Sequence, residues 1–262
     1  MVLSVLITHY NRSQVLKECI NSFENLNMDI SYEFVICDDG SEQNHLDELK
    51  KISQVKLIQS KVNLGLGANI NRGLENCSGK FILYCQEDFL IKSSFSTVLT
   101  EIIELLEKDK IDMVRLTANY KFPKLLFASK SVSQIPKLSF KNFLYNAFQY
   151  SDNPFVIKNG FHNKNGFYLE NVKGSYCELE YAIRIMKSKV KVGILNQYVF
   201  NSSSCDSVLN YRPQEKKIKF KSIYKFIRAL RLHFEYILYD FNKRELLTYK
   251  KTAHYLKPKK IK

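Results

Sequence analysis

The stretch Lys80-Phe-Ile-Leu-Tyr-Cys-Gln-Glu-Asp-Phe89 decides the fold of this chain. Phe81 to Cys85 form an uninterrupted apolar and aromatic run, which is typical of a strand buried on both faces. The run leads into two adjacent acids, Glu87 and Asp88, where the chain should leave the sheet. Ligands of open α/β sheets lie outside the carboxyl ends of the strands, and carboxylates there suit a divalent cation that holds a diphosphate. The pair could equally well only cap a following helix or turn.

The residues around this stretch alternate between strand and helix patterns. Strands are expected at residues 2–8, 32–37, 55–59 and 113–116, with shorter candidates at 190–194 and 198–200. Helices are expected after N-cap residues Ser13 and Ser93 or Ser94, with a short apolar face at 46–52 and a further helix at 174–186. Between about residues 120 and 173 the pattern loosens. Strand–helix units of about 25 to 30 residues predict an α/β fold with a parallel sheet.

The net charge of +14 is concentrated at the C-terminal end of the chain. Residues 216–262 contain 15 Lys and Arg against 3 acids, whereas the first 215 residues contain 25 against 23. A nearly neutral body with a basic tail favours an interaction arm over a basic nucleic-acid-binding fold. Nucleic acid is therefore not the favoured partner, although binding through the tail stays an alternative.

The cysteines and the N-terminal residues bear on the compartment. None of the six cysteines forms a C-x-x-C pair or a Cys/His cluster at zinc spacing, which favours a reducing environment. The first thirty residues do not resemble a signal peptide, and no run of about 18 apolar residues occurs. We therefore expect a cytoplasmic protein that stays in the compartment where it is made.

Four polar segments follow the expected strands. Thr8-His-Tyr-Asn-Arg12 offers an aromatic ring and a guanidinium, Asp38-Asp39 and Glu87-Asp88 offer carboxylates, and the segment from Asn63 to Gly73 is glycine-spaced. Such glycines let a loop backbone approach a ligand closely. The glycine segment matches neither a dinucleotide turn nor a phosphate loop. Each segment alone is weak evidence, since Asp-Asp-Gly-Ser is also a common turn. All four within 90 residues favour one ligand site.

Residues 2–90 resemble the nucleotide-sugar-binding half of a family 2 glycosyltransferase of GT-A fold. The matching pieces are S-V-L-I-T-H-Y-N-R, V-I-C-D-D-G-S, N-x-G…N-R-G and an acid pair at the place of the D-x-D motif. The resemblance implies a Rossmann-like, mostly parallel central sheet flanked by helices, here with a C-terminal basic helical extension. The expected parts are a donor half at 1–110, an acceptor half at 111–212 and the extension at 213–262.

The resemblance also implies a set of site residues. Thr8, Tyr10 and Asp39 would contact the nucleobase of the donor, with Asp38 nearby. Glu87 would face the ribose or the metal, and Asp88 would bind Mn²⁺ or Mg²⁺ on the diphosphate. Further donor contacts are expected from Arg12, Asn63, Gly65 and Asn71, and a UDP-sugar is the favoured donor. The sequence departs from the family pattern at Gln86, where a first acid is common, and at Ile70, where arginine is frequent.

The general base is expected in the second half. An alignment on Arg184 places Glu178 in that role, with Glu180 as the alternative. Ser175-x-x-Glu178 also fits a capping box, and Glu180 with Arg184 an ordinary i,i+4 ion pair. We prefer the base, because the acceptor hydroxyl must lose its proton. The family implies inversion at the anomeric carbon.

Residues 217–241 predict one amphipathic helix with an apolar stripe and a basic face. It would lie on an anionic membrane surface near a lipid-linked acceptor, or pack on the enzyme or a second copy, and the sequence favours neither. The expected function is metal-dependent transfer of a sugar to a glycan or lipid-linked hydroxyl in surface polysaccharide synthesis. The alternatives are a non-catalytic nucleotide-sugar or glycan-binding module and the nucleic-acid binder.

Overall fold

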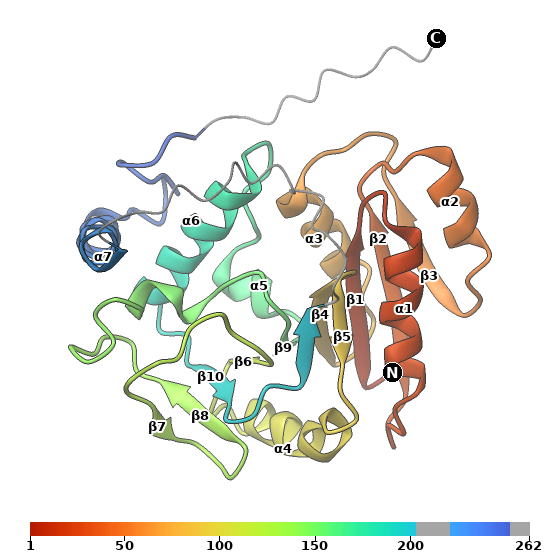
Figure 1. Ribbon diagram of the computed structural model, residues 1–262, viewed down its shortest axis with the longest axis horizontal. Coiled ribbons are helices and arrows are strands. Elements are labelled where there is room, and N and C mark those ends of the chain that lie inside the picture. The colour runs from red at the N-terminus through yellow and green to blue at the C-terminus, as the bar shows by residue number, and fades with distance from the viewer. Residues whose placement is uncertain (203–220, 252–262) are drawn as a thin grey trace.

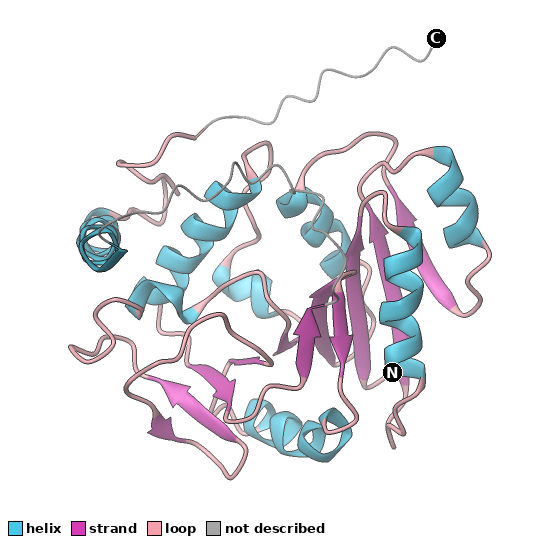
Figure 2. Ribbon diagram, in the orientation of Figure 1, coloured by secondary structure: helices cyan, strands magenta, loops and turns pink. Residues whose placement is uncertain are grey.

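The computed structural model describes residues 1–202 and 221–251. Cys205 and the tail residues 213–220 and 252–262 therefore lie outside the described residues. Figures 1 and 2 show a mixed α/β protein in which helices flank a twisted central sheet. The α/β fold expected from the sequence is thereby confirmed.

In the described part of the chain, nine strands form the main sheet in the order β3-β2-β1-β4-β9-β6-β10-β8-β7. Their bounds are β1 Leu3–His9, β2 Tyr32–Asp38, β3 Val55–Gln59, β4 Phe81–Gln86, β6 Met113–Arg115, β7 Leu126–Phe127, β8 Val132–Ile135, β9 Phe155–Lys158 and β10 Val192–Leu195. Strands β1 to β4 run parallel, β10 is parallel to β6, and β9 runs antiparallel between β4 and β6. A small separate sheet pairs β5 Phe89–Ile91 with β11 Phe200–Ser202.

Helices cover both faces of this sheet. Their bounds are α1 Ser13–Glu24, α2 Gln43–Lys50, α3 Leu66–Glu75, α4 Phe95–Glu107, α5 Phe161–Asn165, α6 Gly174–Lys187 and α7 Lys221–Leu238, with a 3₁₀ turn η1 at Asn146–Gln149. Side chains alternate along the central strands, so Leu6 packs in the core under α3 and α6, whereas Val5 and Ile7 pack in the core under α1 and α4. Two cores explain why the strands contain unbroken apolar runs.

The expected glycine loop at 63–73 is wrong over most of its length, because α3 already begins at Leu66. Leu66, Ile70 and Leu74 recur at helical spacing and face the core. The helical glycines serve close packing instead: a Cβ at Gly67 would lie 2.3 Å from the carbonyl oxygen of Leu169, and one at Gly73 would lie 2.3 Å from Leu6 Cδ1. Of the glycine pair, only Gly65 stays in the loop, with φ of 90°.

The expected cap at Ser13 is also wrong, as is the alternative capping role of Ser175. Arg12 is the N-cap of α1 and Lys173 that of α6, so Ser13 and Ser175 lie inside their helices, and neither cap residue makes a side-chain cap hydrogen bond. The capping box that competed with a functional role for Glu178 therefore does not form. Helix α4 does follow Ser94, as expected, but without a hydrogen bond from its side chain.

The C-terminal residues 221–251 pack against α6 (Figure 1). Leu232, Tyr239 and Leu246 are buried in the core on that side. Lys187 Nζ at the end of α6 donates to the carbonyl oxygens of Ile237 at 3.0 Å and Tyr239 at 2.8 Å. None of the described helices combines the length and the hydropathy that a bilayer-spanning segment needs.

Candidate active site

The parallel register brings the ends of the central strands into line. Thr8 of β1 pairs with Cys37 of β2 on one side and with Gln86 of β4 on the other. The segments that follow these strands, residues 9–12, 39–41 and 87–88, therefore leave the sheet at the same edge. This is the edge at which open α/β sheets bind ligands.

Asp38 fixes the turn after β2. Its Oδ2 accepts hydrogen bonds from the backbone N–H groups of Gly40 at 3.1 Å and Ser41 at 3.0 Å, and its Oδ1 lies 2.8 Å from His9 Nδ1 and accepts from the Ser41 hydroxyl. Burial raises the pKa of Asp38, but the bonds from His9 and Ser41 outweigh it, so the pKa is lowered and the carboxylate stays charged. These bonds give Asp38 a structural role in this turn, behind the site expected for the nucleobase of the donor.

Asp39 anchors the segment that leads into α3. Its two oxygens accept from the N–H groups of Leu64 at 2.8 Å and Gly65 at 2.9 Å, and an Arg72 nitrogen lies 3.6 Å away. Burial raises the pKa of Asp39, and the two backbone bonds and Arg72 offset part of that rise. Asn63 Oδ1 also accepts from Gly65 at 3.1 Å. The fold thus brings Asp39, Asn63 and Gly65 together. Arg72, the arginine of the N-R-G segment, adds a positive charge at this edge that the sequence did not predict.

The other expected donor residues are placed differently. Thr8 is buried, with Oγ1 at 3.4 Å from Tyr84 Oη, and Tyr10 is half-buried in the loop after β1. Asn71 is occupied by the segment before α6: its Nδ2 donates to Tyr168 O at 3.1 Å and to Glu170 Oε1 at 2.8 Å, and its Oδ1 accepts from Tyr168 N at 3.0 Å. Asn71 therefore joins α3 to the segment before α6.

Arg12, Glu87 and Asp88 form a charged cluster at the end of β4. An Arg12 nitrogen lies 3.7 Å from Glu87 Oε1 and 3.4 Å from Asp88 Oδ2. Burial raises the pKa of Glu87 to about 7, with a further contribution from Asp88 against the opposing effect of Arg12. Asp88 Oδ1 is buried without a hydrogen-bond partner. An unsatisfied carboxylate oxygen at a ligand edge is a fit for a divalent cation.

The described residues contain no cluster of three or more His, Cys, Asp or Glu that could enclose a metal ion. A cation at Asp88 would accordingly take most of its oxygen ligands from a bound diphosphate and water. Mg²⁺ bound by one or two carboxylates together with substrate phosphates is a common arrangement. The carboxylate oxygens here are compatible with that arrangement. They do not form a metal site enclosed by protein ligands alone.

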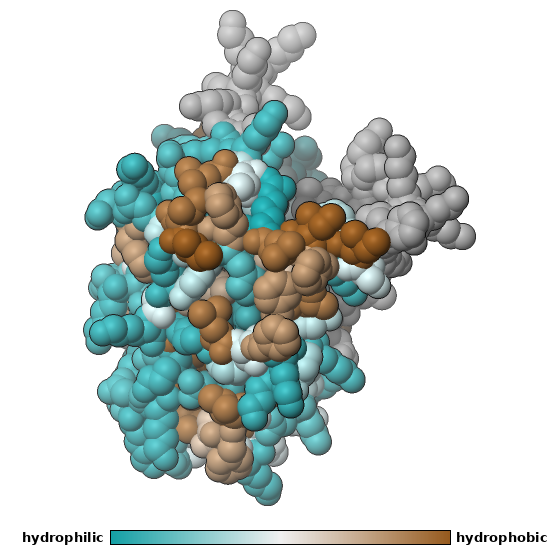
Figure 3. All heavy atoms as spheres, turned by 90° about the vertical axis from the view of Figure 1, so that its left-hand side faces the viewer, coloured by the Kyte–Doolittle hydropathy of each residue, from teal (hydrophilic) through white to brown (hydrophobic). Residues whose placement is uncertain are grey.

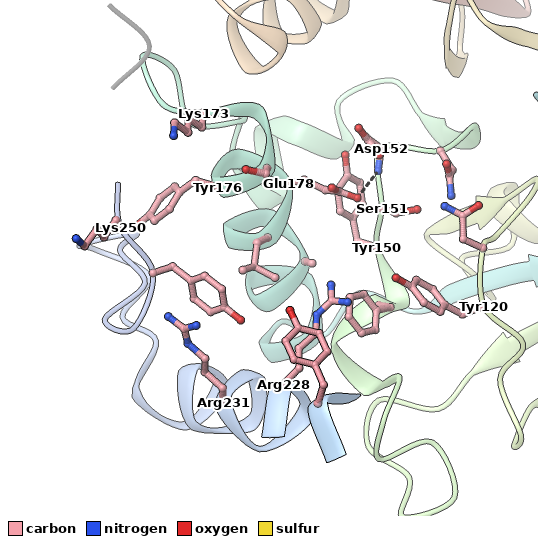
Figure 4. Close-up of a pocket in the computed structure, with 18 of the residues that line it drawn as sticks. Tyr120, Tyr150, Ser151, Asp152, Lys173, Tyr176, Glu178, Arg228, Arg231 and Lys250 are labelled. Carbon is pink, nitrogen blue, oxygen red and sulfur yellow. Dashed lines mark hydrogen bonds between the residues drawn. The ribbon is translucent and has the colours of Figure 1, made fainter. Parts of the chain in front are cut away.

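The strand edge is connected to α6 through Asp152. Gln86 Nε2 donates to Asp152 Oδ2 at 3.0 Å, and the backbone N–H of Asp152 lies 3.4 Å from Glu178 Oε1 (Figure 4). Burial, together with the carboxyl group of Asp152, raises the pKa of Glu178 to about 8. The pKa of Asp152 is raised as well, first by burial. Two adjacent acids with raised pKa values hold a proton between them near neutral pH.

Asp152 is a residue that sequence reasoning missed, although Asn153-Pro154 beside it was noted as a short match to an acceptor loop. Arg115 of β6 holds the segment that carries it: its guanidinium donates to Phe148 O at 2.7 Å and to Ser151 Oγ at 2.5 Å. Burial lowers the pKa of Arg115 to about 10, so the side chain stays charged beside the acid pair.

Glu180, the alternative base, lies on the other side of α6. It is fully buried, 2.7 Å from Arg184, and accepts from the Tyr239 hydroxyl, with Arg244 Nε at 3.8 Å. These partners tie α6 to the segment after α7. Glu180 therefore has a structural setting, whereas Glu178 lines an open cavity.

That cavity has a volume of about 650 Å³ and lies between α6, α7 and the segment around η1. Figure 4 shows Glu178 and Asp152 close together on its wall, with Arg228 and Arg231 rising from α7. Among the site residues expected from the sequence, only Glu178 lines this cavity, and the residues around Asp39 and Asp88 do not.

Known proteins resemble this chain in sequence and in fold. The sequence is 24% identical over 218 residues to a cholesterol galactosyltransferase of Borreliella burgdorferi, and the aligned region covers 76% of this chain and 59% of that protein. It is 32% identical to an uncharacterized glycosyltransferase of Haemophilus influenzae over 41% of this chain and 33% of that protein. A poly(ribitol-phosphate) beta-glucosyltransferase of Bacillus spizizenii is 34% identical over 36% of this chain and 16% of its own length. The chain thus spans well under two thirds of these relatives.

Among solved structures, S. aureus TarS 1-349 in complex with UDP-GlcNAc superposes with a TM-score of 0.62 at 18% identity, over 92% of this chain and 68% of that chain. The complex of the same protein with UDP gives a TM-score of 0.61. At this identity the similarity establishes the fold. The sequence profile described as Glycosyl transferase family 2 matches residues 4–163, more than half of the chain. The strand-edge carboxylates, the fold and this match lead to one conclusion: the chain belongs to glycosyl transferase family 2.

Proposed function

We propose that the protein is a metal-dependent, inverting glycosyltransferase that moves a sugar from a nucleotide-sugar donor, with UDP as the favoured nucleotide, to a hydroxyl of a glycan or lipid-linked acceptor in surface polysaccharide synthesis. One observation carries the proposal. Asp88, whose Oδ1 has no hydrogen-bond partner, lies two residues after Gln86, and Gln86 donates to Asp152. Asp152 in turn adjoins Glu178, and both acids have raised pKa values. A cation site and a base connected in this way suit the displacement of a diphosphate by a hydroxyl.

On this proposal residues 1–110 bind the donor and residues 111–212 bind the acceptor. Thr8, Tyr10 and Asp39 flank the nucleoside, Arg12 lies beside the phosphates, and Asp88 with Glu87 behind it holds Mn²⁺ or Mg²⁺. The cation, when bound, neutralises charge on the departing diphosphate. The Arg12 guanidinium adds a fixed positive charge 3.4 Å from Asp88 Oδ2.

Glu178 is the proposed base. In its carboxylate form it takes the proton of the acceptor hydroxyl while the hydroxyl oxygen bonds to the anomeric carbon and the bond from that carbon to the diphosphate oxygen breaks. A single displacement of this kind inverts the anomeric centre. Asp152 keeps the pKa of Glu178 high enough for proton uptake near neutral pH, and Gln86 and Arg115 hold Asp152 in place.

The apolar face of α7 is proposed to lie on an anionic membrane surface, which would place the enzyme peripherally on the inner face of the cytoplasmic membrane. Seven large apolar residues on this helix are exposed: Ile223, Phe226, Ile227, Leu230, Phe234, Ile237 and Leu238. They share one face, opposite the buried Ala229, Leu232 and Glu235. Figure 3 shows hydrophobic side chains gathered on this side of the molecule. Residues 216–262 contain 15 basic and 3 acidic residues, and this excess of positive charge complements anionic lipids.

Asp88→Asn is expected to abolish the metal-dependent part of nucleotide binding, because it removes the charge of the unsatisfied carboxylate. UDP with Mn²⁺ should raise the melting temperature of the unaltered chain by several degrees at saturating concentrations. The same addition should have little effect on the variant or in the presence of EDTA. Asp47→Asn on the surface of α2 is the control. An equal shift in Asp88→Asn would contradict a cation at this residue.

Glu178→Gln is expected to lower the rate at which UDP is released from the donor by about 10²-fold or more, since a carboxamide accepts no proton. It should keep the melting temperature and the shift with UDP and Mn²⁺. Glu180→Gln is the matched comparison on the same helix. It leaves Arg184 underneutralised in the core and should lower stability by about 3 kcal/mol in urea unfolding. Normal turnover of Glu178→Gln would move the base to another residue, with Asp152 the first candidate.

The pH dependence of kcat/KM for donor hydrolysis tests the acid pair. The active base is deprotonated and its pKa is raised to about 8, so kcat/KM should rise with pH and level off above about pH 8. Asp152→Asn removes the neighbouring charge and should move this rise to lower pH. A profile that falls between pH 6 and 8, or that does not move in Asp152→Asn, would contradict the pairing.

Flotation with vesicles tests the membrane face. Ile227→Asp/Phe234→Asp should weaken binding to phosphatidylglycerol vesicles by about tenfold or more, because two apolar side chains no longer enter the interface. Leu126→Asp/Phe127→Asp alters two exposed apolar residues of β7 and is the control. Flotation that is equal in both variants contradicts the proposal, as does a stable dimer that the α7 variant dissociates without any flotation of the unaltered chain.

A further inference from the structure

The cavity beside Glu178 carries opposite charges on different elements. Its acids are the pair Asp152 and Glu178. Its basic residues come from the N-terminal end of α6, from α7 and from the segment after α7, and they are Lys173, Arg228, Arg231 and Lys250. Because the acid pair retains a proton near neutral pH, the basic residues dominate the charge of the cavity. A cavity with this excess favours an anionic guest.

Arg228 and Arg231 are held by aromatic rings and not by carboxylates. The guanidinium carbon of Arg228 lies 4.5 Å from the centre of the Phe148 ring, and that of Arg231 lies 3.8 Å from the centre of the Tyr249 ring. Arg231 Nε also donates to Thr248 Oγ1 at 2.8 Å. Across residues 1–202 and 221–251, the arginines paired with acids are others, at positions 12, 72, 184 and 244.

A stacked guanidinium is fixed in orientation while its terminal N–H groups stay available at the ring edge. That is the geometry in which arginine binds phosphate with two parallel hydrogen bonds. Figure 4 shows both guanidinium groups directed from α7 toward the cavity, on the side of α6 that carries Glu178 and Lys173. The two arginines therefore bring two oriented positive charges to the cavity from the same helix.

An anion bound in this cavity would be distinct from the diphosphate of the donor. Asp88 and Arg12, at the proposed cation site, do not line the cavity, and its connection to the strand edge runs through Asp152 and Gln86. Lys173 precedes α6 in the proposed acceptor half, and the other basic residues belong to the C-terminal extension that packs against α6. Tyr224 and Ile227 line the same cavity and are exposed on α7.

We propose that this cavity is an acceptor subsite for a phosphate group, with Arg228 and Arg231 as its ligands and Lys173 and Lys250 as further sources of positive charge. The proposal rests on the proposed glycosyltransferase function, because the acceptor hydroxyl must reach Glu178 in the same cavity. The phosphate can belong to a lipid-linked glycan or to a phosphate-containing soluble glycan. Both share the chemistry that the arginines recognise.

Isothermal titration calorimetry on the full chain tests the subsite with glycerol 3-phosphate as the soluble probe and farnesyl phosphate in neutral detergent as the lipid probe. Glycerol and farnesol are the uncharged counterparts. At least one phosphate probe should bind, and its counterpart should not. Arg228→Gln/Arg231→Gln should weaken that binding by about tenfold or more, because charged hydrogen bonds to the phosphate are lost. Lys225→Gln/Lys243→Gln removes the same charge from exposed positions outside the cavity and should leave the affinity within about twofold.

A second variant covers the case in which loss of the stacked arginines prevents folding. Lys173→Gln/Lys250→Gln removes exposed cavity charge without touching the rings and should weaken phosphate binding by about threefold. Phosphate probes that bind no better than their counterparts overturn the subsite, as does an equal loss in the Lys225/Lys243 control. Binding by one probe only identifies the source of the phosphate. Failure of UDP with Mn²⁺ to bind the unaltered chain would count against the proposed function instead, because that measurement does not involve the cavity.

Discussion

The parallel pairing of β1 with β2 and β4 is the constraint on which the rest of the structure depends. The pairing sets Thr8 opposite both Cys37 and Gln86, so every residue that follows these strands emerges at one edge of the sheet. A shift by one residue would exchange the two faces of each strand and disrupt the side-chain packing of both cores. Packing on both faces makes that shift costly, and so the register of the core also fixes the geometry of the site.

The carboxylates at this edge divide into two groups by what surrounds them. Asp38 and Asp39 accept hydrogen bonds from the backbone and hold the turns that shape the edge. Glu87, Asp152 and Glu178 are removed from water next to other acids, and their pKa values rise because burial disfavours the charged form. Such perturbed acids in a cleft are typical of functional sites. The surroundings of each carboxylate thus distinguish those that hold turns from those with strongly perturbed acidity.

The C-terminal residues complete this architecture. Through Tyr239 and Arg244 they meet Glu180 in the core, and through Arg228 and Arg231 they form a wall of the cavity that contains Glu178. One face of α7 therefore serves packing, while the opposite face exposes an apolar stripe whose member Ile227 also lines the cavity. As the proposed acceptor site, a cavity bordered by an apolar surface and stacked arginines suits an acceptor that has both an anionic and an apolar part.

The sequence by itself determined the α/β class, the strand at 55–59 to the residue, and the strand ends at Asp38 and Gln86 to within a residue, because buried strands require apolar runs that are visible locally. It misjudged Asn63–Gly73, whose glycines serve helix packing against Leu169 and Leu6. Only the tertiary structure decided that Asp152 joins Glu178, that Glu180 is a buried ion-pair partner, and that Arg228 and Arg231 line the cavity. These side chains lie far apart along the chain or on different faces of one helix. Their chemistry follows from burial and contact, which local sequence does not encode.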